Sequence, residues 1–179
     1  MGIVKKIFLG GLILSLVAVI VLALVVFGPL SGLSNEKPEE GSTWVYYDYS
    51  FETEATDSGG LAMAKASAAD LADQFKHDVY DLTDLENPKN VSYYDSLTFQ
   101  DGTIQRKHFE RTTSNIDGLD IYTGVEEETL NYGTYDGKKI TINEESFEKA
   151  FIREGVLYVY VKVVSMADTV AILQFKPAQ

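Results

Sequence analysis

The 179-residue sequence contains no cysteine, which excludes disulfide bonds, thiolate metal sites and cysteine nucleophiles together. It has only two histidines, His77 and His108, and they lack the paired spacing of a zinc site. No Gly-x-Ser-x-Gly elbow, phosphate-cradling glycine loop or Ser-x-x-Lys set with its companion motifs is present. We therefore expect a protein without cofactor or metal that is not an enzyme. An extracellular hydrolase stays open as a distant alternative, because unassigned Asp and Glu residues are abundant.

Charged residues are absent from residues 7–30, which consist mainly of Leu, Ile, Val, Ala and Phe. Twenty-four helical residues span roughly 36 Å, which is enough to cross a hydrocarbon core of about 30 Å. Lys5 and Lys6 precede the run, whereas Glu36 is the first acidic residue after it. Because basic flanks stay inside, we expect a cytoplasmic stub at residues 1–6 and a single-pass helix in the cell membrane. The C-terminal part would then be extracytoplasmic.

A cleaved secretory signal is the competing interpretation of this N-terminus. Such a signal has an apolar core of about 7–15 residues followed by a small-x-small cleavage site. The run at residues 7–30 is longer, and no Ala-x-Ala pattern closes it. The sequence therefore favours a retained anchor.

Basic residues are few in the remaining chain, because 13 of the 15 lysines and arginines but all 27 acidic residues follow residue 35. The excess of negative charge in this part of the chain argues against nucleic-acid binding, which requires a basic surface. It also argues against binding flat on an anionic lipid surface. Residues 31–42 are rich in Gly, Ser, Pro and Glu and are predicted to form a linker. Residues 43–179 are long enough for one core, so we predict a single extracytoplasmic domain.

Residues 43–54 alternate in a strand pattern. One face would carry Val45, Tyr47, Tyr49 and Phe51, and the other Trp44, Tyr46, Asp48 and Ser50. A helical period follows and predicts a helix of about 20 residues. Its apolar stripe consists of Ala64, Ala68, Leu71, Phe75, Val79 and Leu82. The Asn87-Pro88 pair is expected to end this segment.

From residue 91 onward the chain alternates in short segments separated by turn pairs. The first segment, with Val91, Tyr93, Leu97 and Phe99, is predicted as one strand that runs up to Asp101-Gly102. Asp-Gly occurs at 101–102, 117–118 and 136–137, and Glu154-Gly155 precedes the most apolar segment, residues 156–164. The pattern predicts a mainly-β domain of about nine strands with one helix after the first strand. Successive hairpins favour an antiparallel meander, and its closure into a barrel would remove exposed edges.

This layout resembles the fatty-acid-binding proteins of the lipocalin superfamily and small bacterial lipocalin-like domains. Gly41 and Trp44 at the first strand and the strand–turn–strand segment 133–142 carry the resemblance, which covers residues 41–176. The family has Gly-x-Trp where this chain has Gly-x-x-Trp. The resemblance implies a lipocalin-like barrel that binds a small apolar or amphipathic ligand. A partly open sheet wrapped on the helix, and a cystatin-like or nuclear-transport-factor-like cone, are the alternative folds.

Residues 104–111 form a basic cluster in an otherwise acidic domain. Strand alternation places Arg106 and His108 on one face and Lys107, Phe109 and Arg111 on the other. The resemblance implies that an interior arginine holds a ligand carboxylate, and Arg106 is the matching candidate. A charged strand facing solvent is the alternative explanation.

The eleven tyrosines are too many for one small core. We expect some of them, including Tyr158 and Tyr160, to line a pocket or a protein-binding patch. Cross-strand aromatic pairing is the plainer explanation for most of the others. The acidic run Glu126–Glu127–Glu128 does not fit a calcium loop, because the required ligand spacing is missing.

Two functions follow from these patterns. In the first, the chain is a membrane-anchored interaction module, an accessory subunit of an envelope or membrane complex, with a filled core and an exposed aromatic patch. In the second, it binds a small apolar ligand in a cavity of a few hundred cubic ångströms, through Arg106, His108, Tyr158 and Tyr160.

Overall fold

The computed structural model describes residues 36–84, 87–163 and 168–178. The predicted membrane helix at residues 7–30 lies outside the described residues. Within the described ranges, no helix combines the length and the apolar character needed to cross a bilayer.

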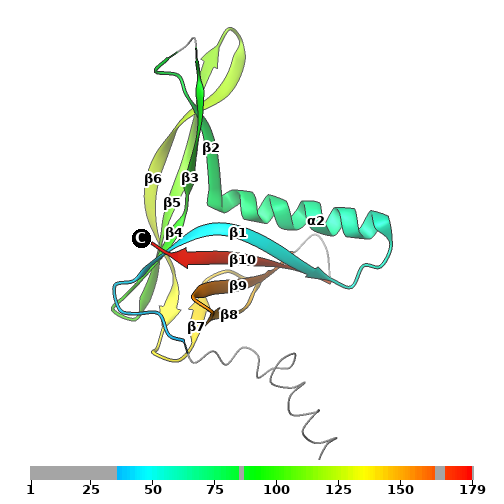
Figure 1. Ribbon diagram of the computed structural model, residues 1–179, viewed down its shortest axis with the longest axis vertical. Helices are drawn as coiled ribbons and strands as arrows, with labels where there is room; N and C mark the ends of the chain where they lie inside the picture. Colours follow the sequence, from blue (N-terminus) through cyan, green and yellow to red (C-terminus); the bar gives the residue numbers. More distant parts are fainter. Residues whose placement is uncertain (1–35, 85–86, 164–167, 179) are drawn as a thin grey trace, which may run out of the picture. The chain divides into compact units, whose positions relative to one another are not determined.

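The described domain is mainly β, with one α-helix after the first strand (Figure 1). Its elements are β1 (Thr43–Thr53), α2 (Ser58–Ala72), the 3₁₀ turn η2 (Asp73–Phe75), β2 (Lys76–Asp81), β3 (Lys89–Tyr94), β4 (Ser96–Gln100), β5 (Thr103–Ile116), β6 (Leu119–Tyr135), β7 (Ile140–Ile142), β8 (Phe147–Arg153), β9 (Val156–Lys162) and β10 (Thr169–Pro177). Eight strands form one antiparallel sheet in the order β7-β6-β5-β4-β1-β10-β9-β8. The sheet is a nearly closed barrel that opens between β7 and β8, which is consistent with a calycin-like fold.

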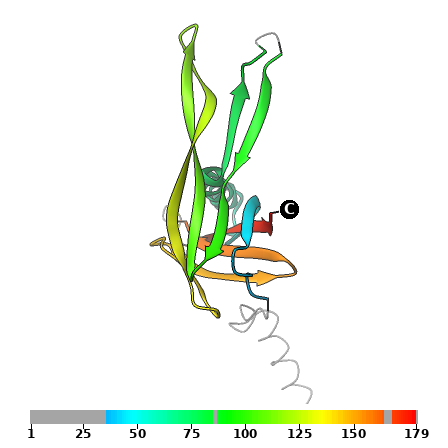
Figure 2. The same cartoon turned by 90° about the vertical axis from the view of Figure 1, so that its left-hand side faces the viewer.

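The strands follow one another as a meander except at one insertion. After β1 the chain forms α2, η2 and the separate two-stranded sheet β2–β3, and β4 then returns to pair with β1. The β2–β3 hairpin and the long β5–β6 hairpin extend from the barrel in the same direction (Figures 1 and 2). The prediction of about nine strands and one helix is therefore confirmed in outline, with ten strands in two sheets among the described residues.

The hairpin turns follow the predicted turn pairs. At Asp101-Gly102, Asp117-Gly118 and Glu154-Gly155 both residues have positive φ, as a two-residue type I′ turn requires. The turn at Asp136-Gly137 differs, because only its glycine has positive φ. There the Asp136 carboxylate accepts hydrogen bonds from the backbone N–H groups of Lys138 and Lys139, at 2.9 and 2.7 Å.

The predicted faces of β1 change within the strand. Tyr47 is an extra residue that interrupts the register between Tyr46 and Asp48. Beyond this bulge Tyr49 lies opposite Leu173, so it shares the inner face with Tyr46. Simple alternation therefore assigned the second half of the strand to the wrong face.

The predicted helix ends earlier than the apolar period indicated. Asp57 caps its N-terminus by accepting a hydrogen bond from the N–H of Gly60, and the helix ends at Ala72. Phe75 belongs to the 3₁₀ turn, and Val79 lies in strand β2. Phe75 and Val79 matched the helical stripe by coincidence, because their spacing of four residues also equals two strand periods.

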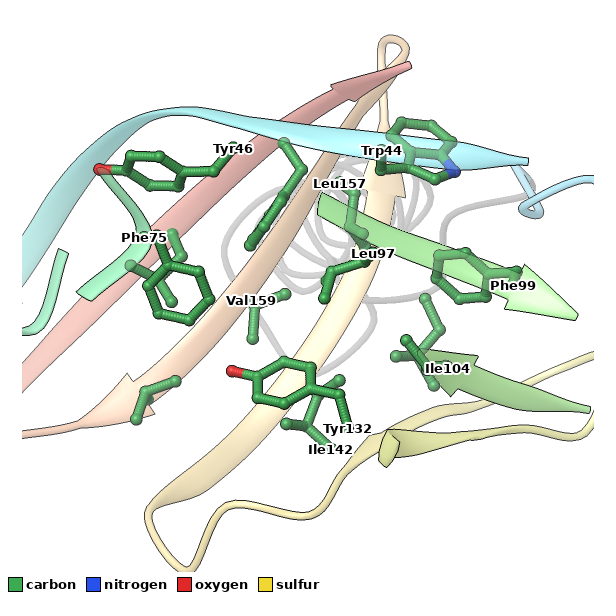
Figure 3. Close-up of a cluster of buried hydrophobic side chains, with 14 of the residues drawn as sticks. Trp44, Tyr46, Phe75, Leu97, Phe99, Ile104, Tyr132, Ile142, Leu157 and Val159 are labelled. Atoms are coloured by element: carbon green, nitrogen blue, oxygen red, sulfur yellow. The ribbon is translucent and has the colours of Figure 1, made fainter. Parts of the chain in front are cut away.

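The barrel interior is filled by large side chains (Figure 3). Phe75 lies among aromatic rings at its centre, with centroid distances of 5.7 Å to Tyr46, 5.8 Å to Phe175 and 6.3 Å to Tyr132. Trp44 is buried as well, and its Nε1–H donates to the hydroxyl of Ser42 at 3.1 Å. The other members of this core come from β4, β5, β7, β8, β9 and β10: Leu97, Phe99, Ile104, Ile140, Ile142, Ile152, Leu157, Val159, Val161 and Leu173, with Ala72 from the helix.

The second half of the predicted linker lies against the barrel. Glu36 forms a β-bridge with Ile152, and its carboxylate accepts hydrogen bonds from the N–H groups of Glu154 and Gly155. The N–H of Gly41 donates to the carbonyl of Phe99 at 2.7 Å. Residues 36–42 are thus fastened to the domain.

Candidate functional site

Asp95 occupies the point where the chain passes from the β2–β3 hairpin into the barrel. Alternation predicted one strand through this position, whereas the structure has two, β3 and β4, in different sheets. The backbone N–H of Asp95 donates to the carbonyl of Phe75 at 3.0 Å, and its carbonyl accepts from the N–H of Tyr46 at 2.9 Å. These bonds fix a carboxylate that is completely buried.

Each oxygen of this carboxylate accepts two hydrogen bonds. Oδ1 accepts from Nε2 of His77 at 2.9 Å and from the backbone N–H of Phe109 at 3.1 Å. Oδ2 accepts from Nε of Arg106 at 2.6 Å and from Nδ1 of His108 at 2.9 Å. The acceptor capacity of Asp95 is therefore used within the protein. We call Asp95, His77, Arg106 and His108 the Asp95 cluster.

Arg106 supplies the positive charge of the cluster. It points inward from β5 because it lies two residues after the buried Ile104. Its guanidinium lies over the ring of Phe75, 3.8 Å from the centroid, and Nη2 donates to the carbonyl of Gln74 at 2.6 Å. Arg106 and Asp95 thus form a buried, hydrogen-bonded ion pair.

The hydrogen bonds to Asp95 determine the tautomers of both imidazoles. In the neutral rings, His77 carries its proton on Nε2 and His108 on Nδ1, since an ionised carboxylate only accepts. Nδ1 of His108 also lies 3.4 Å from Nη2 of Arg106. Because both nitrogens then carry hydrogens, this approach is not a hydrogen bond.

Burial lowers the pKa of His77 below its ordinary value of 6.5, and the attraction of Asp95 opposes this shift only in part. His108 and Arg111 add repulsion in the same direction as burial. His77 is therefore neutral at pH 7, so Arg106 rather than His77 balances the charge of Asp95.

A surface hollow of about 440 Å³ opens beside the cluster. His77, Arg106 and His108 form its inner wall, and Asp70, Asp73, Gln74, Arg111 and Leu130 form the rest. Arg111 pairs with the exposed Asp73 at 3.0 Å across the rim. The hollow is polar and open to solvent, unlike an enclosed apolar ligand cavity.

Three residues of the cluster are of metal-binding types. One ligand atom each from His77, Asp95 and His108 lies within 4.8 Å of the others. A divalent ion there would have to replace the N–H groups that now donate to Asp95, and it would lie beside the buried guanidinium of Arg106. Because Asp95 is already paired with Arg106 and saturated with hydrogen bonds, the cluster does not fit a metal.

The four predicted site residues fall in two places. Arg106 and His108 lie together in the Asp95 cluster, as strand alternation placed them. Tyr158 and Tyr160 instead alternate with the buried Leu157, Val159 and Val161 of β9, so they lie on the outer face of the barrel. There they stack on Phe151 at 5.5 and 5.6 Å between centroids.

Sequence reasoning missed Asp95 and His77. Asp95 had a detectable signal, because it is a lone acidic residue in the alternating series Tyr93, Leu97 and Phe99. In the structure Arg106 pairs with Leu97 in the adjacent strand, which places the two charges close together. His77 had no such signal, because it fell within the predicted helix.

Comparisons with protein-family models, with curated proteins and with solved structures found no match to this chain. The nearly closed, mainly-β barrel and its interior Asp–Arg–His cluster are therefore established from this chain's own sequence and structure.

Proposed function

We propose that this chain is a membrane-anchored extracytoplasmic interaction module that docks a protein partner through its two hairpins. The partner would be a component of an envelope or membrane complex, and the barrel would serve as the scaffold that holds the hairpins. The filled interior of the barrel carries this proposal.

The interior offers a ligand little space, because large side chains occupy it. Phe75, Tyr132 and Phe175 meet at its centre, and Arg106 stacks on Phe75. The position that a ligand carboxylate would take beside the arginine is occupied by Asp95. A filled scaffold is what the interaction function requires.

Exposed aromatic and apolar side chains lie on both hairpins. Tyr80 and Tyr93 on β2–β3 and Leu119 and Tyr122 on β6 are all at least 36% exposed. Tyrosine rings provide rigid contact area at low entropic cost, so they favour protein interfaces.

The charge of the hairpins indicates what kind of partner fits. Residues 76–94 and 107–128 contain ten acidic and four basic side chains. We therefore expect a partner surface that is basic around apolar pockets for the tyrosines.

Site-specific photocrosslinking in the native cell tests this proposal. A photoreactive phenylalanine analogue at Tyr122 or Tyr80 should crosslink one membrane or envelope protein through a basic surface. The same analogue at Tyr47 is the matched control, because Tyr47 is a similarly exposed tyrosine (39%) on β1 of the barrel. Equal crosslinking from all three positions, or none from the hairpins, would contradict docking through the hairpins.

Binding of a small amphipathic ligand is the second candidate, and the hollow beside Arg106 and His108 favours it. A ligand carboxylate would have to compete with Asp95 for Arg106. The ligand would then bind in the hollow rather than inside the barrel, and without Tyr158 and Tyr160.

A further inference from the structure

The only two histidines of the chain donate to the same buried carboxylate, that of Asp95. Histidine is the side chain whose ordinary pKa places its charge change between pH 5 and 8. Any histidine-dependent response of this protein therefore passes through the Asp95 cluster.

The cluster lies where the β2–β3 hairpin is attached to the barrel. Among the described residues, no backbone ladder joins this hairpin to the eight-stranded sheet. The attachment instead includes the His77–Asp95 bond, the buried side chain of Val79, and contacts of the Phe109 ring with Tyr93 and His77. The hairpin can thus separate from the barrel without breaking a barrel ladder.

Protonation of the histidines would place an extra positive charge in this attachment. With neutral histidines, the charges of Asp95 and Arg106 cancel. The charged and titratable groups around His77 and His108 come from several elements. They are Asp95 itself, Arg106 and Arg111 from β5, Asp70 from α2, Asp73 from η2, Tyr93, which pairs with His77 across the β2–β3 ladder, and Glu128, which pairs with His108 across the β5–β6 ladder. Asp70, Asp73 and Glu128 are exposed, so water screens their charges and they compensate a buried imidazolium weakly.

We propose that acidification releases the β2–β3 hairpin from the barrel, because protonated His77 leaves Asp95 for water while the barrel stays folded. In the closed state, with the hairpin on the barrel, His77 is neutral. In the open state, with the hairpin released, His77 binds a proton with its ordinary affinity. The open population therefore rises as the pH falls below 6.5, by up to about tenfold per pH unit for one proton. This release does not require a docking partner, and it would regulate docking where the hairpin binds one.

Hydrogen exchange of the full chain, followed by mass spectrometry between pH 7.5 and 5.0 and corrected for intrinsic exchange, tests the release. Below pH 6.5 the protection of β2 and β3 should fall by up to about tenfold per unit, while β9 and β10 keep theirs. Loss of protection in all four strands together, or constant protection of β2 and β3, would overturn the proposal.

Two variants separate the histidines. His77→Gln keeps a side-chain N–H that can donate to Asp95 but does not titrate, so the pH dependence of β2–β3 exchange should disappear. His108→Gln should retain it, because His77 still titrates. Persistence of the dependence in His77→Gln would overturn the proposal.

Imidazole NMR of the wild-type chain tests the same claim if His77→Gln does not fold. The titration of His77 should share its midpoint with the loss of protection in β2–β3. Titration of His77 near pH 6.5 while the hairpin stays protected would overturn the proposal.

Discussion

Nε of Arg106 lies 2.6 Å from Oδ2 of Asp95, and both side chains are buried in the wall of the barrel. Burying either charge alone is costly, whereas the pair with its added hydrogen bonds is tolerated. The same arrangement neutralises the interior cation that suggested a ligand site. The pair therefore bears on the stability of the domain and also on ligand binding, because Asp95 occupies the place that a ligand carboxylate would take beside Arg106.

Replacement of Asp95 by Asn should destabilise the domain by about 3–5 kcal/mol, because Arg106 stays buried without its counter-charge. Urea denaturation of the two proteins measures this difference. Asp73→Asn is the matched control, since it also removes an aspartate that pairs with an arginine, but at an exposed site. Its cost should stay below about 1 kcal/mol. Equal costs for the two variants would contradict the role given to burial.

Removal of both charges should cost less than the two single changes predict. Arg106→Met in an Asp95→Asn background no longer leaves a buried charge unpaired, so the double variant should be more stable than the sum of the singles by about 0.5–3 kcal/mol. A complete double-mutant cycle in urea measures the coupling. Strict additivity would show that the two side chains do not interact.

Two buried tyrosines should limit the stability of the domain at alkaline pH. Burial raises the pKa of Tyr46 and Tyr132 above the ordinary 10.0, with Asp48 adding to the shift at Tyr46. Their contribution to stability is complete below pH 10 and is lost as the pH rises towards the folded-state pKa. Phenolate absorbance should show these two rings ionising only together with unfolding. Ionisation of all eleven tyrosines in one native transition would contradict this.

Gly133 allows β6 and β7 to approach closely. A Cβ at this position would lie 2.2 Å from the backbone oxygen of Thr141. Gly133→Ala should therefore destabilise the domain by about 1–3 kcal/mol. Gly124→Ala, in the same strand, meets only the side-chain hydroxyl of Thr112, which can rotate away. Thermal unfolding should show the larger loss for Gly133→Ala, and the reverse order would contradict this account of the pairing.

Local patterns in the sequence predicted most of the architecture. Asp101-Gly102 and Asp117-Gly118 marked hairpins because the type I′ turn needs positive φ at both positions. The strand at residues 156–164 was predicted because the segment is almost entirely apolar, and β9 lies there with one face buried along its length. These signals depend on neighbours in sequence, so they can be detected without a structure.

The remaining features depend on contacts between distant residues. The bulge at Tyr47 reverses the faces of β1, and no composition signal marks it. The helix ends at Ala72 although Phe75 and Val79 continue its apolar period. Asp95 becomes the centre of a cluster only when β2, β4 and β5 meet. Alternation predicted that Arg106 and His108 share a face, whereas the pairing of Arg106 with Asp95 depends on contacts between strands.

Native mass spectrometry of the full-length chain, released from detergent, tests the central claim that the barrel is a scaffold filled and neutralised by its own side chains. We expect the mass of the 19.9 kDa chain without a bound small molecule, both in the wild type and in Arg106→Met. A co-purifying small molecule that is present on the wild-type protein and lost from Arg106→Met would contradict the claim.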